Sequence, residues 1–386
     1  MMRRVVVAVV EALCECRTAV VLQGTYGVIW HLMSQANRYL NMDWVRYVLA
    51  TAVVVAHYSF LTGQHLVFPI SSGSAVGIFF GLSGFLVYAS YERASNLKQY
   101  IANRARRILP PYIFIVVGCA VGFAFISTLP IGQYFSDITF WRYLVSNLAF
   151  LNFLQPELPG VFEHSVTSAV NGSLWTLKVE WMLYLSIPIF CYVVRCFRGA
   201  FDYVIAGIFL LSVLYRQFMQ MCYESTGDEL YHILSYQFAG QMVYFYTGVL
   251  VFRHLTWVSA HRLQVSCLCI VALALAKCME GNLPSSHWQS MLFNLVQPIA
   301  AVCIALVISI SKPVLASTIQ RIGNCSYEMY LFHFPIIQLA VLWALPFRFN
   351  PVMVFSLTML SVFVISYIYN KGYSSFKNYI SNDHRN

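Results

Sequence analysis

The chain has 386 residues, of which 59% are hydrophobic and 10% are charged, and its net charge is +9. Because soluble domains carry about 25% charged residues, this composition excludes a soluble globular protein and, with it, a soluble nucleic-acid binder. The length instead suits an all-α, polytopic membrane helix bundle of about ten transmembrane helices, each about 20 residues long.

Residues 1–41 do not contain a clear membrane span. The apolar run from Val5 to Val10 is followed at once by charged residues, so it is too short to cross a bilayer. Cys14 and Cys16 form a C-x-C pair without further metal-ligand partners, and we expect no metal site. We interpret this segment as an N-terminal extension that is interfacial or disordered.

From Trp44 onward the apolar stretches are longer, and they predict membrane helices. A shorter apolar stretch at 143–154 predicts a re-entrant or interfacial segment. The expected helices are 44–62, 74–91, 109–128, 174–194, 201–221, 236–252, 263–279, 290–310, 328–346 and 352–370.

The charges of the loops predict the topology. Ten crossings place both termini on one side, and the cytoplasmic loops of a membrane protein carry its excess of Lys and Arg. Acidic residues such as Asp137 and Asp228 fall in the loops of the opposite side. We therefore expect both termini, including a tail over 372–386, in the cytoplasm. The basic residues of the expected cytoplasmic loops are Arg93, Lys98, Arg104, Arg106, Arg107, Arg195, Arg198, Arg253, Arg262, Lys312 and Arg321.

The first expected helix holds two polar residues on one face, Arg46 and His57. They are eleven residues apart, about three turns, which separates them by roughly 16 Å along the axis. Arg46 would offer an anion-binding group at the cytoplasmic mouth, and His57 a titratable base deeper in the membrane. The alternative is a buried histidine that is hydrogen-bonded to a neighbouring backbone or hydroxyl group.

The second expected helix contains the sequence FFGLSGF over Phe79–Phe85. Its two glycines and Ser83 allow close approach of the backbone to a ligand or to another helix. Both interpretations stay open from the sequence.

A basic motif follows, in which Arg104 and Arg107 are one helical turn apart and precede Pro110 and Pro111. Guanidinium groups suit bidentate contacts with phosphate, so this pair is a candidate phosphate site. The alternative is a cluster of basic charge that only sets the topology.

The sequence SLWTLKVE over Ser173–Glu180 opens the helix expected at 174–194. Glu180 lies about two turns into that helix, where a carboxylate is costly. It would orient a base or bind a sugar hydroxyl, and pairing with a basic group of a neighbouring helix is the alternative.

The last motif, SYEMYLFHFP, occupies residues 326–335. Tyr330 and His333 are three residues apart and share a helix face, and Tyr327 lies one turn earlier. A direct role in substrate contact and a structural aromatic anchor are both open.

In this order the five segments resemble the motifs of acyltransferase family 3, a family of membrane acyltransferases. Arg46 and His57 match the family's pattern of a basic residue and a histidine with ten positions between them. The other segments match Phe-Phe-x-x-Ser-Gly-Phe, Arg-x-x-Arg-x-x-Pro, Ser-Leu-Trp-x-Leu-x-x-Glu and Ser-Tyr-x-x-Tyr-Leu-x-His-x-Pro. The resemblance covers residues 37–370 and places a membrane acyltransferase domain over 42–371. Lys178 departs from the small polar residue common at its position.

The resemblance implies that an acyl group, expected to be acetyl, passes from cytoplasmic acyl-CoA to a hydroxyl of a cell-surface carbohydrate or its lipid-linked precursor. It implies a multi-pass protein of the inner (cytoplasmic) membrane, in the stand-alone form without the extracytoplasmic esterase-like domain of some members. We expect His57 and Glu180 in catalysis, with His57 as a general base or a transient acyl carrier. The residues expected to bind acyl-CoA are Arg46, Ser83, Arg104 and Arg107. The residues expected to bind the acceptor are Trp175, Tyr327, Tyr330 and His333.

Two other classes of protein stay open. A multi-pass transporter or flippase for a lipid-linked or small anionic substrate also suits ten helices with ionisable groups near the midplane. A scaffold or sensor without chemistry leaves the intramembrane His57 and Glu180 unexplained. The sequence does not fix the acceptor, the acyl chain or the oligomeric state.

Overall fold

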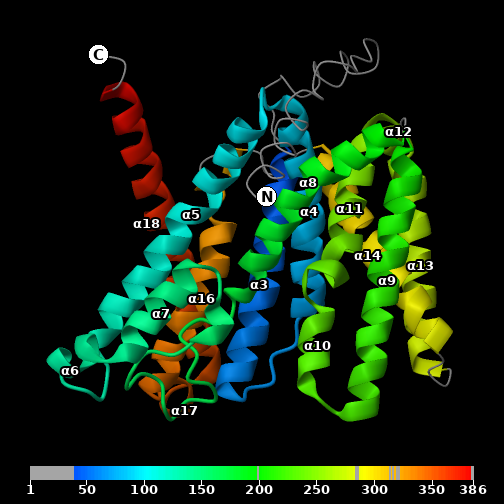
Figure 1. Cartoon of the computed structure of the whole chain (residues 1–386). Coiled ribbons are helices and arrows are strands. Elements are labelled where there is room, and N and C mark those ends of the chain that lie inside the picture. Colours follow the sequence, from blue (N-terminus) through cyan, green and yellow to red (C-terminus); the bar gives the residue numbers. More distant parts are fainter. Residues whose placement is uncertain are drawn as a thin grey trace, which may run out of the picture. The chain divides into compact units, whose positions relative to one another are not determined.

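The computed structural model describes residues 39–383 except 198–199, 283–286, 313, 315–316 and 319–321. Within these ranges all regular structure is helical, which confirms the all-α class (Figure 1). Among the described residues a helix lies at each of the ten stretches expected to form one. The predictions for residues 1–38, with most of the N-terminal extension, and for residues 384–386 lie outside the described residues.

Seven of the described helices are long and apolar enough to cross a membrane, so the chain is a multi-pass membrane protein. These helices are α3 (Leu40–Thr62), α4 (Ser72–Arg93), α5 (Leu97–Gly122, continued by η1, Phe123–Phe125), α8 (Trp175–Cys196), α9 (Phe201–Thr226), α14 (His287–Ile310) and α18 (Pro351–Asp383).

Three further helices match expected spans but fall outside this set. They are α11 (Phe238–Arg253), α13 (Arg262–Asn282) and α16 (Ser326–Leu342). With 16 and 17 residues, α11 and α16 are about 24 and 26 Å long, less than the hydrocarbon core of about 30 Å. Both are buried along most of their length, because other protein segments surround them. The number of ten crossings therefore stays a prediction.

One expected helix start is wrong. Helix α5 begins well before residue 109 and runs through Pro110 and Pro111, so Arg104 and Arg107 lie within a helix and not in a loop. Each proline removes one backbone donor and leaves a carbonyl group without its partner in the helix. Such prolines are tolerated in membrane helices where side chains or water donate hydrogen bonds to these carbonyl groups.

The described residues form two compact units, and several helices contribute to both. Unit 1 contains the described residues of 39–45, 76–105 and 179–316, and unit 2 contains those of 46–75, 106–178 and 317–383. The remaining short helices are α6 (Ile131–Ser136), α7 (Ile138–Leu148), η2 (Asn152–Leu154), α10 (Glu229–Ser235), α12 (Leu255–Ala260) and α17 (Leu345–Arg348).

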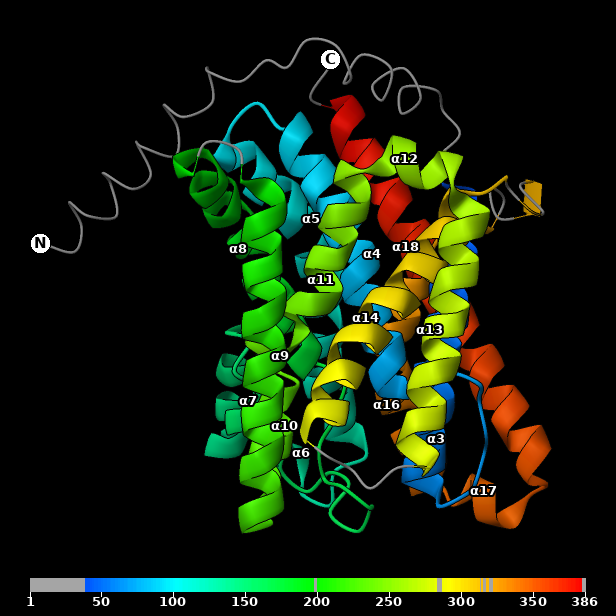
Figure 2. The same ribbon diagram turned by 90° about the vertical axis from the view of Figure 1, so that its right-hand side faces the viewer.

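Unit 1 is built around α11, which packs against α9 and α14, while α13 runs beside α14 (Figure 2). The backbones of α4 and α11 also approach closely. A Cβ atom at Gly84 would lie 1.9 Å from the Phe245 carbonyl oxygen, and one at Gly248 would lie 1.9 Å from the Gly81 carbonyl oxygen. Glycine is therefore required at both positions, and the FFGLSGF motif serves helix packing.

Unit 2 has an aromatic core. Residues of α5, α6, α7 and the segment before α8 pack against α16, and α16 packs against α18. Helix α7 covers part of the stretch expected to be re-entrant or interfacial. Its Phe140 and Tyr143 are buried, whereas Trp141 and Val145 are exposed, so the helix packs by one face only.

Candidate active site

Two histidines meet in unit 2, one from α3 and one from α16. Nδ1 of His57 lies 2.7 Å from Nε2 of His333, a hydrogen-bond distance. The two rings are nearly parallel, with centroids 5.0 Å apart, and the Phe334 ring meets His57 edge-on at 5.2 Å. His333 is fully buried, whereas His57 is partly exposed. The structure therefore brings together the two motif histidines, which are 276 positions apart.

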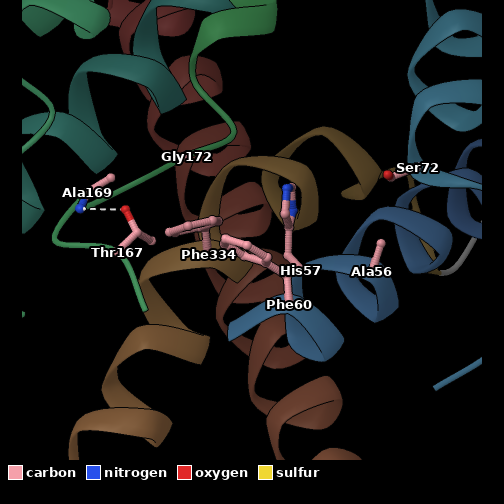
Figure 3. Close-up of a pocket in the computed structure, with 8 residues that line it drawn as sticks. All are labelled: Ala56, His57, Phe60, Ser72, Thr167, Ala169, Gly172 and Phe334. Atoms are coloured by element: carbon pink, nitrogen blue, oxygen red, sulfur yellow. Dashed lines mark hydrogen bonds between the residues drawn. The ribbon is translucent and has the colours of Figure 1, made fainter. Parts of the chain in front are cut away.

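His57 lines a cavity of about 430 Å³, and Figure 3 shows it with the other residues of the wall. The wall combines aromatic rings with small residues and a hydroxyl on either side, which suits a compact ligand that carries hydroxyl groups. The lining residues are Ala56, His57, Phe60, Ser72, Thr167, Ala169, Gly172 and Phe334. All of them belong to unit 2.

The start of α8 holds α16 in place beside this cavity. The Asn171 side-chain amide donates to the Leu331 carbonyl at 2.8 Å, and the hydroxyl groups of Thr176 and Tyr330 lie 2.9 Å apart. A Cβ atom at Gly172 would lie 2.8 Å from the Phe334 ring, so the glycine allows that ring its position in the wall. Part of the SLWTLKVE segment and the residues before it thus position the helix that carries His333.

One wall of the cavity is a loop that is held by the buried side-chain amide of Gln338. Nε2 of Gln338 on α16 donates to the backbone carbonyls of Thr167 and Ala169, at 2.8 and 3.0 Å. Gln338 has no exposed surface, so these bonds form in an apolar environment, where they are hard to replace.

Glu180 belongs to a different polar group, in unit 1. The Ser83 hydroxyl donates to its Oε1 at 3.4 Å, and the Tyr184 hydroxyl donates to the same oxygen. Tyr184 is held in turn, because the Tyr100 hydroxyl donates to its carbonyl at 2.8 Å. Both of these donors to the carboxylate are hydroxyl groups, one of α4 and one of α8.

The three arginines of the expected acyl-CoA site differ in their surroundings. Arg46 is buried near the start of α3, with 8% of its surface exposed. Nη2 of Arg104 donates to the Ser90 hydroxyl at 3.1 Å, whereas the Arg107 side chain is exposed. Arg107 is thus more accessible to a phosphate than Arg104, although both lie on α5.

The other expected acceptor residues lie in unit 2. Tyr330 packs against His333 with ring centroids 6.0 Å apart, and Tyr327 donates to the Ile108 carbonyl at 3.4 Å. Trp175 is partly buried at the first residue of α8. Tyr330 thus contacts one member of the histidine pair.

Reasoning from the sequence missed several residues of this site. Gln338 gave a usable signal, because an amide inside an apolar helix needs a partner. Phe60 and Ala169 gave none, since an aromatic and a small residue are ordinary in a membrane protein. The neighbouring Phe334 lay inside a motif, but nothing in the sequence indicated that its ring touches His57.

The fold and this site define a multi-pass membrane protein with a histidine pair beside a cavity. Its residues 39–371 match the family model described as an acyltransferase domain, acyltransferase family 3. The chain belongs to this family, which confirms the family resemblance of its five motifs.

Two curated relatives are similar to the chain. An O-acetyl transferase of Shigella phage Sf6 is 34% identical over 148 residues, which are 37% of this chain and 43% of that protein. Nodulation protein 10 of Rhizobium leguminosarum bv. viciae is 25% identical over 330 residues, which are 78% of this chain and 84% of that protein. The first match thus spans less than half of the phage protein. No solved structure matches the chain.

Proposed function

We propose that this protein is a membrane O-acetyltransferase of the inner (cytoplasmic) membrane. It moves the acetyl group of cytoplasmic acetyl-CoA to a hydroxyl of a cell-surface carbohydrate or its lipid-linked precursor. Membership of an acyltransferase family favours this activity over transport. The phage relative is named an O-acetyl transferase, which supports O-acetyl transfer, and it matches over only part of its length.

The single observation that carries the proposal is the place of His57. Its imidazole lies on the wall of a cavity, it is fixed by a hydrogen bond to His333, and it sits within the family match. A general base needs this combination of access to the substrate and a fixed direction.

In the proposed step, Nε2 of His57 takes the proton of the acceptor hydroxyl as its oxygen attacks the thioester carbonyl carbon. The new C–O bond forms and the C–S bond breaks. Coenzyme A leaves as a thiolate, which takes the proton back from the His57 imidazolium. The products are the O-acetyl ester and free coenzyme A, and His57 returns to its neutral form.

On the donor side, the guanidinium groups of Arg46, Arg104 and Arg107 are proposed to bind the phosphate groups of coenzyme A. The exposed Arg107 makes the first contact, since Arg104 already bonds to Ser90. Guanidinium groups are well suited to this role because they bind phosphate in a bidentate manner.

On the acceptor side, the cavity of about 430 Å³ is proposed to take one sugar ring, which stacks on Phe60 or Phe334. In unit 1, Glu180, which is held by hydroxyl groups, is proposed to bind a sugar hydroxyl. Trp175 and Tyr327 are proposed to support the acceptor site in unit 2.

The proposal is tested in the host by comparing the surface polysaccharides with and without the gene. Loss of the gene should remove one O-acetyl signal from the NMR spectrum of a polysaccharide, and the wild-type gene should restore it. His57→Ala should insert in equal amount and restore nothing. An unchanged spectrum in the deletion strain, or full restoration by His57→Ala, would overturn the proposed activity.

A further inference from the structure

The proposed transfer step uses His57 and does not assign a role to its partner, His333. We propose that His333 is a positioning residue that fixes the tautomer of His57, so that Nε2 of His57 presents its lone pair to the cavity. This inference rests on the proposed function, and it replaces the direct contact between His333 and substrate expected from the sequence.

The backbone of α16 sets the direction of the hydrogen bonds in this pair. Nδ1 of His333 lies 3.2 Å from the carbonyl oxygen of Met329, one turn earlier on α16. A carbonyl oxygen can only accept, so Nδ1 of His333 carries the hydrogen. A fully buried imidazole is expected to be neutral, because a charge is costly in apolar surroundings, and its other nitrogen is then an acceptor.

The direction of the next hydrogen bond follows. Nε2 of His333 accepts, so Nδ1 of His57, 2.7 Å away, must donate. A neutral His57 with hydrogen on Nδ1 has its lone pair on Nε2. The chain of donors thus runs one way, from His57 through His333 to the Met329 carbonyl, and it leaves the basic nitrogen of His57 unoccupied.

The packing of the rings supports the same role. His333 has no exposed surface and does not line the cavity, so it cannot reach a substrate there. Its ring lies nearly parallel to that of His57, with 19° between the planes, and Phe334 restricts His57 from a second side. Tyr330, whose hydroxyl is bonded to Thr176, packs against His333 in turn. These contacts fix the orientation of both imidazoles.

The matched variants are His333→Phe and His333→Gln. Phenylalanine keeps an aromatic ring of similar size but accepts no hydrogen bond from His57. The glutamine amide offers an oxygen that accepts from His57 and an NH₂ group that can donate to the Met329 carbonyl. The purified full chain is assayed with radiolabelled acetyl-CoA and surface polysaccharide from a host that lacks the gene.

We expect His333→Phe to lower kcat about 10- to 100-fold, because a lost orienting bond leaves both tautomers of His57 populated. The KM for acetyl-CoA should change less than about twofold, since His333 is distant from the donor's phosphates in the proposed scheme. His333→Gln should recover kcat to within a few-fold of the wild type. If His333 had a purely structural role, His333→Phe would not lower kcat while leaving KM nearly unchanged. His333→Gln would then also not restore kcat.

Two results would overturn the inference. One is a wild-type kcat in His333→Phe, and the other is an equal loss in His333→Phe and His333→Gln when both unfold at the wild-type temperature. An inactive His57→Ala beside a fully active His333→Phe would remove only this inference. An active His57→Ala would instead remove the proposed function itself.

Discussion

Glu180 in unit 1 and His57 in unit 2 are both ionisable residues of apolar helices, but they differ in their hydrogen bonds. In unit 1, the hydroxyl groups of Ser83 and Tyr184 both donate to one oxygen of Glu180. In unit 2, His57 bonds to His333 through one nitrogen, and its ring lies on a cavity wall. A group held by donors is suited to binding, whereas a base with an unoccupied nitrogen is suited to moving a proton.

Burial of an ionisable residue in a membrane helix therefore does not by itself identify the catalytic group. Both His57 and Glu180 are costly residues in an apolar span. The difference between them lies in their hydrogen-bond partners, His333 of α16 for His57, and Ser83 of α4 with Tyr184 of α8 for Glu180, which suggest chemistry for one and binding for the other.

The largest expected effect comes from replacing each group by the same amide. His57→Gln should lower the rate of transfer about 10²- to 10⁴-fold, because an amide cannot take a proton. Glu180→Gln should lower it no more than about tenfold, since its amide oxygen still accepts from Ser83 and Tyr184. Rates with radiolabelled acetyl-CoA measure both. Equal losses of rate in the two variants would contradict the assignment of proton transfer to His57 and of binding to Glu180.

A smaller loss of activity is expected from a larger side chain at Gly172, which packs closely against the Phe334 ring in the cavity wall. Gly172→Val places its side chain against the Phe334 ring, because even a Cβ atom there lies 2.8 Å from that ring. The ring should shift into the cavity and lower kcat/KM for the polysaccharide acceptor about tenfold. The matched control is Gly132→Ala, where a Cβ atom meets nothing within 4 Å. Unchanged kcat/KM in Gly172→Val would show that the acceptor does not use this cavity.

The smallest effect concerns the N-terminus of α7, away from both groups. Asp137 caps this helix by accepting from the Thr139 backbone amide at 2.7 Å, and this bond holds the pKa of Asp137 below its ordinary value. Because the folded pKa is below the unfolded one, the stabilisation is present above about pH 4 and is lost as the pH falls through the folded pKa. Asp137→Asn keeps a capping side chain but removes this titration.

The measurement is the unfolding midpoint of wild type and Asp137→Asn in detergent between about pH 3 and pH 6. The wild type should lose more stability than the variant over this range, by a small margin, because Asp137 is only partly buried and solvent screens its carboxylate. Parallel curves for the two proteins would contradict the role of the carboxylate.

Much of the fold follows from composition and hydropathy. Each stretch from the first helix at 44–62 to the last at 352–370 contains a helix, because lipid forces backbone groups to bond within the segment. Helix ends were less predictable, and α5 shows why. Pro110 and Pro111 suggested a helix start, but α5 begins earlier and runs through them, although each proline removes one backbone donor.

The candidate site was predictable only in part. His57 and Glu180 stood out as polar residues in apolar helices, and the sequence spacing brought Tyr330 and His333 to one face. The contact between His57 and His333 joins residues 276 positions apart, so no local pattern could reveal it. The loop at 167–169 was equally hidden, because its place depends on hydrogen bonds from Gln338.

The sequence by itself determined that this chain is a helical membrane protein of an acyltransferase family, because hydropathy and motif spacing are local properties of the chain. Only the tertiary structure decided which polar side chains become partners. A hydrogen bond needs two groups within about 3 Å, and that distance is set by how helices pack and not by their order along the chain. The pairing of His57 with His333, and of Glu180 with Ser83, is therefore a property of the fold, whereas Tyr184 meets Glu180 as a residue one turn later on the same helix.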